Sequence, residues 1–180
     1  MLVDDDLETL RYPIGRFRPR QGLSREEIDG LIEDIAALPG DFRRVAAPLT
    51  REQLDTPYRP GGWTVRQVIH HVPDSHVNAY IRFKLALTED QPTIKPYDEA
   101  AWAELPDGRG EDIEGSLLLL EATHRRWTHV LRSLDTGAWA RAFHHPDSGV
   151  VSLEHALQLY AWHGRHHLAH VTRLRERSGW

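Results

Sequence analysis

The chain has 180 residues, a net charge of -5 and no cysteine. This length suits one domain with a full core, so we expect residues 1–180 to form a single domain. The negative charge gives no reason to expect a nucleic acid or an anionic membrane as a partner. No signal peptide or membrane-spanning run is evident, which predicts a cytoplasmic location. Without thiolates, any metal must be held by His, Asp or Glu.

In the N-terminal part of the chain, one segment has no periodic spacing of apolar residues and the next has apolar residues at helical spacing. Residues 1–23 are expected to be irregular, because proline and glycine recur there. Ser24 followed by Glu27 is a capping box, and it predicts the start of a helix. The Pro39-Gly40 pair is expected to kink or interrupt this helix before the apolar pattern resumes.

A second helix is predicted from Val65 to about Leu87. Thr64 with Gln67 forms its capping box. Pro73 lies inside the helix and is expected to kink it, because proline removes one backbone hydrogen bond.

The second half of the chain contains a long connection and two more helices. Residues 89–111 hold three prolines and two glycines, which predicts a long crossover loop. Helical periods follow over 113–134 and 153–177, and a turn at 145–149 precedes the last helix, which Ser152 is expected to cap. Four long amphipathic helices predict an all-α fold, an up-and-down-type four-helix bundle.

The last helix carries the most informative pattern. Apolar residues and histidines alternate at spacings of three and four, so they share one face: Leu153, Ala156, Tyr160, His163, His167, His170 and Leu174. His163 and His167 are one turn apart, which lets two imidazoles hold one metal ion. A lone core histidine is more often a hydrogen-bonded structural residue, but a pair at ligand spacing favours a metal.

A third ligand would come from a facing helix, and periodicity alone does not choose it. His76 shares a stripe with valines and a phenylalanine, which favours burial. His71 shares a stripe with polar residues, which is either a solvated face or the polar lining of a site. His124 on the third helix is a further candidate, although one histidine in an apolar seam is more often a core residue.

Several stretches resemble the YfiT-type branch of the DinB-like superfamily. These are GWTVRQVIHHV at 62–72, DSH at 74–76, YIRFKL at 80–85, YPIG at 12–15, LDTPYR at 54–59, KPYDE at 95–99 and the run at 162–170. The resemblance covers nearly the whole chain. It implies a bacterial four-helix bundle described as a metal-dependent hydrolase, and some members transfer the thiol bacillithiol onto electrophiles.

The resemblance also implies the ligand set. Carried over to the matching positions, the family's metal triad is His71, His163 and His167. The chain departs from the family at Pro73, two residues after His71, where the family usually has another residue.

Such a site predicts one divalent ion per chain, zinc first and nickel second. Three neutral imidazoles leave a position open for water or a thiol, so the ligand set alone does not separate hydrolysis from thiol transfer. The resemblance places thiol S-transfer ahead of hydrolysis. The partners would be a small-molecule thiol with an electrophile, or a hydrolysable substrate. A third hypothesis is a structural, non-catalytic metal. A fourth ligand from His76, His124 or His170 would favour this hypothesis.

Other polar residues near the motifs are candidates for supporting the ligands or binding substrate. They are Asp74, Ser75, Asn78, Glu154 and His170, with Arg66 and Arg82 for an anionic group. A solvated or structural role is at least as common for each of them. Trp63 and Trp162 are expected to be core or interface residues that stand beside the ligands. The six tryptophans and the resemblance together predict a homodimer.

Overall fold

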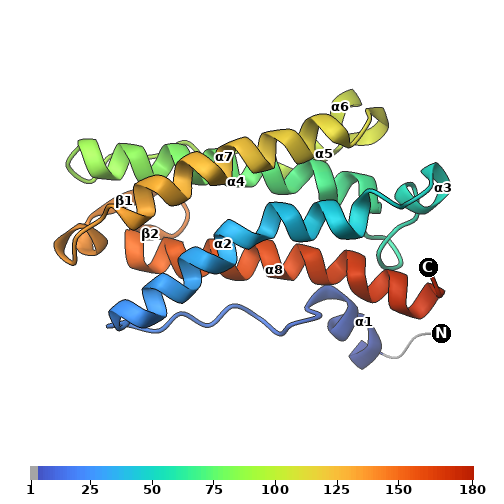
Figure 1. The fold of residues 1–180 in the computed structure, drawn as a ribbon, viewed down its shortest axis with the longest axis horizontal. Coiled ribbons are helices and arrows are strands. Elements are labelled where there is room, and N and C mark those ends of the chain that lie inside the picture. The colour runs from blue at the N-terminus through green and yellow to red at the C-terminus, as the bar shows by residue number, and fades with distance from the viewer. Residues whose placement is uncertain (1–3) are drawn as a thin grey trace.

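A computed structural model describes residues 4–180 and shows an all-α four-helix bundle with a small hairpin (Figure 1). The four long helices are α2 (Arg25–Ala46), α4 (Val65–Thr88), α7 (Glu114–Arg132) and α8 (Leu153–Ser178). Within residues 4–180, no helix is both long and apolar enough to cross a membrane.

The predicted helix starts are confirmed by their capping bonds. Ser24 and Glu27 exchange hydrogen bonds at the start of α2, and Thr64 and Gln67 do the same at the start of α4. Ser152 accepts a hydrogen bond from the backbone N–H of His155 at the start of α8. Each bond satisfies an amide that the first helical turn leaves without a partner.

The two helix-internal prolines do not end their helices. Pro39 lies within the continuous helix α2, so of the kink or interruption expected there the interruption is wrong, and Pro73 lies within the continuous helix α4. A proline removes one backbone N–H, but packing on both sides of the break keeps the rest of the helix in place.

The expected irregular segments contain short elements. Residues 4–11 form α1 (Asp4–Arg11), which corrects the prediction of an irregular 1–23 in this part; residues 1–3 lie outside the described part of the chain. The short helix α3 (Arg51–Leu54) precedes α4, and the connection at 89–111 holds α5 (Glu99–Ala103) and α6 (Pro106–Gly110). Asp98 caps α5, and a proline occupies the first turn of α6.

The predicted turn at 145–149 is the tip of a β-hairpin. After the 3-10 helix η1 (Gly137–Ala140), strands β1 (Ala142–His145) and β2 (Gly149–Ser152) pair antiparallel, with His145 opposite Gly149. Strands of four residues carry too short a pattern to be recognised from sequence.

The connection between α4 and α7 sets the topology. Arg66 at the start of α4 donates to the Glu111 carbonyl just before α7, over 2.9 Å. Arg141, which follows α7 and η1, donates to the Ala86 carbonyl at the end of α4, over 2.6 Å. The helices α4 and α7 therefore run in the same direction, as Figure 1 shows, and the long connection returns the chain to its starting end. This corrects the expected up-and-down order.

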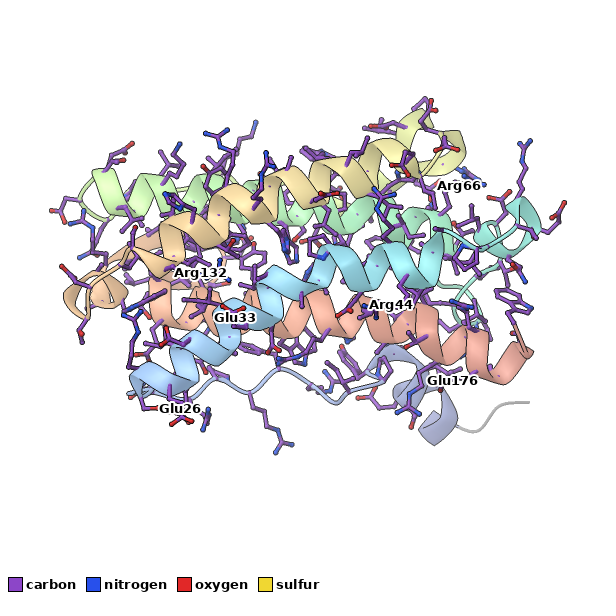
Figure 2. The ribbon with its side chains drawn as sticks, viewed as in Figure 1. Glu26, Glu33, Arg44, Arg66, Arg132 and Glu176 are labelled. Carbon is purple, nitrogen blue, oxygen red and sulfur yellow. The ribbon has the colours of Figure 1, made fainter. Side chains whose placement is uncertain are left out.

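The helices α2 and α7 run in opposite directions. At one end Arg43 pairs with Glu114, and at the other Arg132 pairs with Glu33 at 2.7 Å (Figure 2). These ion pairs are exposed and contribute little stability each.

The core is divided by polar side chains. One apolar cluster lies toward the hairpin and includes Phe83 and Trp127, and a second lies toward α3 and includes Val68 and Leu120. Along α4, α7 and α8 the two clusters are separated by histidines, which we call the histidine layer: His71, His76, His124, His163 and His167. Buried imidazoles in mid-bundle need partners, so this layer is where a functional site is expected.

Candidate metal centre

Three imidazoles from α4 and α8 converge in the histidine layer. Ring nitrogens of His71, His163 and His167 all lie within 4.8 Å of one another. His71 and His167 are 7% and 9% exposed, and His163 is partly buried. The structure thus brings together the three residues that the sequence and the resemblance selected.

The spacing of the nitrogens fits a shared ion. The Nε2 atoms of His71 and His163 are 3.3 Å apart. Two nitrogens each bound about 2.0–2.1 Å from a tetrahedral zinc lie about 3.3 Å apart. In addition, Nδ1 of His167 is buried without a hydrogen-bond partner among the described residues. An unpaired buried ring nitrogen is costly, and these donors therefore suit a metal ligand set.

The environment keeps the triad in the form that binds metals. Burial lowers the pKa of His71 to about 4. Burial, followed by the neighbouring imidazoles, lowers the pKa of His163 and of His167 well below the usual value. Neutral imidazole is the ligating form, so all three rings are ready to bind at neutral pH.

The two histidines that competed for the ligand role lie behind His163. His76 Nε2 is 3.1 Å from His163 Nδ1, and His76 Nδ1 is 2.8 Å from His124 Nε2. His124 Nδ1 is 2.5 Å from the Ile35 carbonyl oxygen. The apolar stripe correctly indicated that His76 is buried, but both of its nitrogens are engaged away from the triad.

His170 does not complete the triad. Its Nε2 donates to the Arg11 carbonyl at 3.1 Å, and its ring stacks on Tyr58 with centroids 4.0 Å apart. Ring nitrogens of His166, His167 and His170 also lie within 4.8 Å of one another, and this second group shares His167 with the first. Within residues 4–180 no fourth His, Asp or Glu joins the group of His71, His163 and His167.

The other candidates on α4 lie one to three turns beyond His71. Asp74 is partly buried, and burial with the nearby Asp107 raises its pKa to about 6. Ser75 faces the hydroxyls of Tyr97 and Tyr160. The Asn78 amide donates to the Asp74 carbonyl of its own helix at 2.9 Å.

Arg82 is the most unusual of these candidates. It is 9% exposed and donates to the Tyr160 hydroxyl at 3.2 Å. Among the described residues no carboxylate forms an ion pair with it. The Tyr160 ring is 5.9 Å from the His163 ring, so this buried cation is separated from the triad by one side chain.

Three candidates have structural partners instead. Arg66 pairs with Asp55 at 2.7 Å and with the Glu111 carbonyl, so it is not free for substrate. Glu154 accepts from the Gly22 amide at the far end of α8. Trp162 stacks on His166, with centroids 4.4 Å apart. Trp63 does lie against a triad ring, 4.8 Å from His71.

The hydrogen bonds that support His163 are not evident from helical spacing, which presents His76 and His124 only as alternative ligands. The signal that could have found their role is Pro39, since a helix-internal proline leaves the carbonyl four residues earlier without its helical donor.

The fold and the triad define a class: a four-helix bundle with a three-histidine group of metal-ligand type. Comparison with known proteins gives the family. Residues 35–171 match the DinB superfamily model, and the chain belongs to that superfamily.

Two curated relatives are similar over almost their whole lengths. The chain is 52% identical over 172 residues to "Putative metal-dependent hydrolase YfiT" of Bacillus subtilis, covering 95% of this chain and 97% of that protein. It is 53% identical over 174 residues to a Bacillus cereus protein also named "Putative metal-dependent hydrolase", covering 97% of this chain and all of that one (100%).

A solved structure is similar as well. The B. subtilis YfiT structure superposes with a TM-score of 0.93 at 51% identity, and the match covers 96% of this chain and 99% of that one. That protein is described as "a probable metal-dependent hydrolase with an unusual four-helix bundle topology". These relatives support an enzyme that depends on a metal.

The buried histidines predict that the metal-free protein loses stability on mild acidification. Burial lowers the pKa of His71, His124 and His166 from 6.5 to about 4. Between pH 6.5 and about pH 4, these histidines bind protons in the unfolded chain but stay neutral in the folded chain. Stability is therefore fully present above pH 6.5 and is lost as pH falls toward 4, by up to about 1.4 kcal/mol per group and pKa unit.

Urea unfolding of chelator-treated protein at pH 7.5 and pH 5.5 measures this loss. Asp74 acts in the opposite direction, because its raised pKa adds stability as pH falls through about 6, but it is one group against several. The exposed His129 provides a control, since His129→Ala should keep the pH dependence. Equal unfolding free energies at the two pH values would contradict the prediction.

Proposed function

We propose that the chain is a metal-dependent enzyme that activates a low-molecular-weight thiol for transfer to an electrophile. The observation that carries the proposal is the group of three neutral imidazoles, which no fourth protein ligand joins within residues 4–180. A divalent ion held there, zinc first and nickel second, would lower the pKa of a thiol or water bound at its open position. The resemblance to bacillithiol-using relatives favours the thiol.

The proposed roles of the chain's own residues follow from their positions. His71, His163 and His167 hold the ion through neutral nitrogens. Arg82 lies one side chain away, and an uncompensated buried guanidinium favours a substrate with an anionic group. Asp74 follows His71 by three residues on α4, and its pKa of about 6 suits a group that takes a proton near neutral pH.

Hydrolysis is the second candidate. It is favoured by the names of the relatives, which are called metal-dependent hydrolases. The same ligands would serve it, with Asp74 taking a proton from water in place of a thiol.

The test offers zinc- and nickel-loaded protein an anionic thiol, mercaptosuccinate, or a neutral one, 2-mercaptoethanol, with monochlorobimane. In the reaction sulfur attacks the carbon that carries chlorine, chloride leaves, and the thiol proton is released. We expect metal-dependent conjugation that His71→Ala abolishes. Arg82→Gln should slow the reaction of mercaptosuccinate by about 10-fold or more, as expected for the loss of one charge-assisted hydrogen bond, and should leave 2-mercaptoethanol little changed.

A parallel panel of esters and amides without thiol separates the two candidates. Metal-dependent hydrolysis with no conjugation would replace the first proposal by the second. Inactivity in both panels, with an ion that does not exchange, would favour the structural reading. His129→Ala is the matched control, because it removes an exposed histidine distant in sequence from the triad.

A further inference from the structure

A row of three imidazoles connects the proposed ligand His163 to the backbone of α2. We call His163, His76 and His124 the histidine row. Its contacts are 3.1 Å from His163 to His76, 2.8 Å from His76 to His124, and 2.5 Å from His124 to the Ile35 carbonyl. The row therefore crosses the bundle from α8 through α4 and α7 to α2.

The carbonyl at the end of the row sets the direction of every bond. A carbonyl oxygen only accepts, so His124 must carry its proton on Nδ1. The remaining nitrogen of neutral His124 is an acceptor, so His76 donates to it from Nδ1. The remaining nitrogen of His76 in turn accepts from Nδ1–H of His163. Both inner rings are buried, at 0% and 1% exposed, which disfavours a charged form that would break this order.

Pro39 explains why the Ile35 carbonyl is available. In an α-helix the N–H of residue 39 would donate to the carbonyl of residue 35. Proline has no N–H, so α2 leaves this carbonyl without its helical partner, and His124 takes the vacant place. Pro39 on α2 thus leaves an acceptor free for a side chain on α7.

We propose that His76 and His124 are positioning residues that fix His163 as its Nδ1–H tautomer and present its Nε2 to the metal. The proposal rests on the metal site proposed above, and it adds two residues that do not touch the ion. Groups that hold the second nitrogen of a ligating histidine orient the ring and raise its basicity. Here the holding group is another imidazole, itself held by the next.

The first test reads the tautomers directly in the metal-free protein. Long-range ¹H–¹⁵N correlation spectra of ¹⁵N-histidine-labelled protein, assigned with single variants, distinguish Nδ1–H from Nε2–H. We expect Nδ1–H for His124, His76 and His163. An Nε2–H form at any of the three would overturn the proposal, and this result does not depend on metal binding or activity.

The second test measures zinc affinity in competition with a chelator. His76→Leu removes the acceptor of the His163 proton, and we expect affinity to fall about 10- to 100-fold. His76→Gln offers an amide oxygen as acceptor and should recover most of the loss. The matched control is His70→Leu, since His70 is a buried histidine on the same helix that contacts Ser116 and not the row.

The outcomes separate this inference from the site it rests on. If the unmodified protein binds neither zinc nor nickel, the proposed metal site fails, whatever the tautomers. If it binds zinc and His76→Leu binds equally well, the positioning role fails while the site stands. If His76→Leu does not fold, Pro39→Ala is used instead, because it returns an N–H that competes for the Ile35 carbonyl. We then expect a greater share of the Nε2–H tautomer at His124. An unchanged spectrum would count against the role of Pro39.

Discussion

Replacing His167 with alanine is expected to abolish stoichiometric metal binding and the thermal stabilisation that the metal provides. An ion that binds only the folded state, present at a free concentration of 100 times its Kd, adds about 2.7 kcal/mol to the free energy of unfolding. With two of three imidazoles left, the site loses a ligand that no described neighbour replaces. Metal analysis and thermal unfolding with and without zinc measure both effects.

Two further variants make this test specific. His129→Ala should keep one ion per chain, since that histidine is exposed. Full metal occupancy in the double variant His163→Ala/His167→Ala would show that the ion lies elsewhere. In that case the group of His166, His167 and His170 would also be excluded, because it shares His167.

Replacing Gly164 with alanine is expected to destabilise the fold by up to about 2 kcal/mol and to weaken metal binding. A Cβ at this position would lie 2.3 Å from Cδ2 of Leu38, and 3.1 Å from its Cδ1. Leu38 is 3% exposed, so it has little space to move, and overpacking of this kind costs about 1–3 kcal/mol. The better helix propensity of alanine offsets up to about 1 kcal/mol. His163 precedes this glycine, so its position shifts with the helix.

Urea unfolding and zinc affinity test this prediction, and the chain supplies its own control. Gly115 lies in α7 with nothing within 4 Å of an added Cβ, so Gly115→Ala should stabilise by up to about 1 kcal/mol. Adding Leu38→Val to Gly164→Ala should recover part of the loss, because it removes volume at the clash. A Gly164→Ala variant as stable as Gly115→Ala would show that α2 and α8 are not held at this distance.

The helices were predictable because local chemistry determines where they begin. Ser24 with Glu27 and Thr64 with Gln67 satisfy the first amides whatever the rest of the chain does, and the structure confirms both. The continuity of α2 through Pro39 was not predictable in the same way. The carbonyl of Ile35, which Pro39 leaves without its helical donor, is instead bonded by His124, 89 residues from Ile35 in the sequence.

The direction of the helices was also beyond local reasoning. The apolar faces of α4 and α7 are compatible with either orientation, and the choice is made by the connection at 89–111. Its contacts with the bundle involve residues distant in sequence, such as Gln67, which donates to the Ala103 carbonyl at 2.9 Å. The helical spacing of apolar residues, with a period of 3.6, gives no information on such contacts.

The site was predictable to the extent that it lies within one helix. The interval between His163 and His167 is a property of α8 alone, whereas the partner on α4 could not be chosen between His71 and His76 by periodicity. His71 and His76 are five residues apart in the sequence, and both side chains are buried. The difference lies in what each ring faces, namely Nε2 of His163 for His71 and Nδ1 of His163 for His76.

The position of the site along the chain has a consequence for how the protein is made. His71 and His163 are separated by 92 residues, and His167 follows later still. During synthesis, which proceeds from the N-terminus at about 5–20 residues per second, α2, α4 and α7 are made before the ligands on α8 exist. The apolar faces of these helices are therefore exposed before a metal can stabilise the fold. The ion can bind only once the last helix is released.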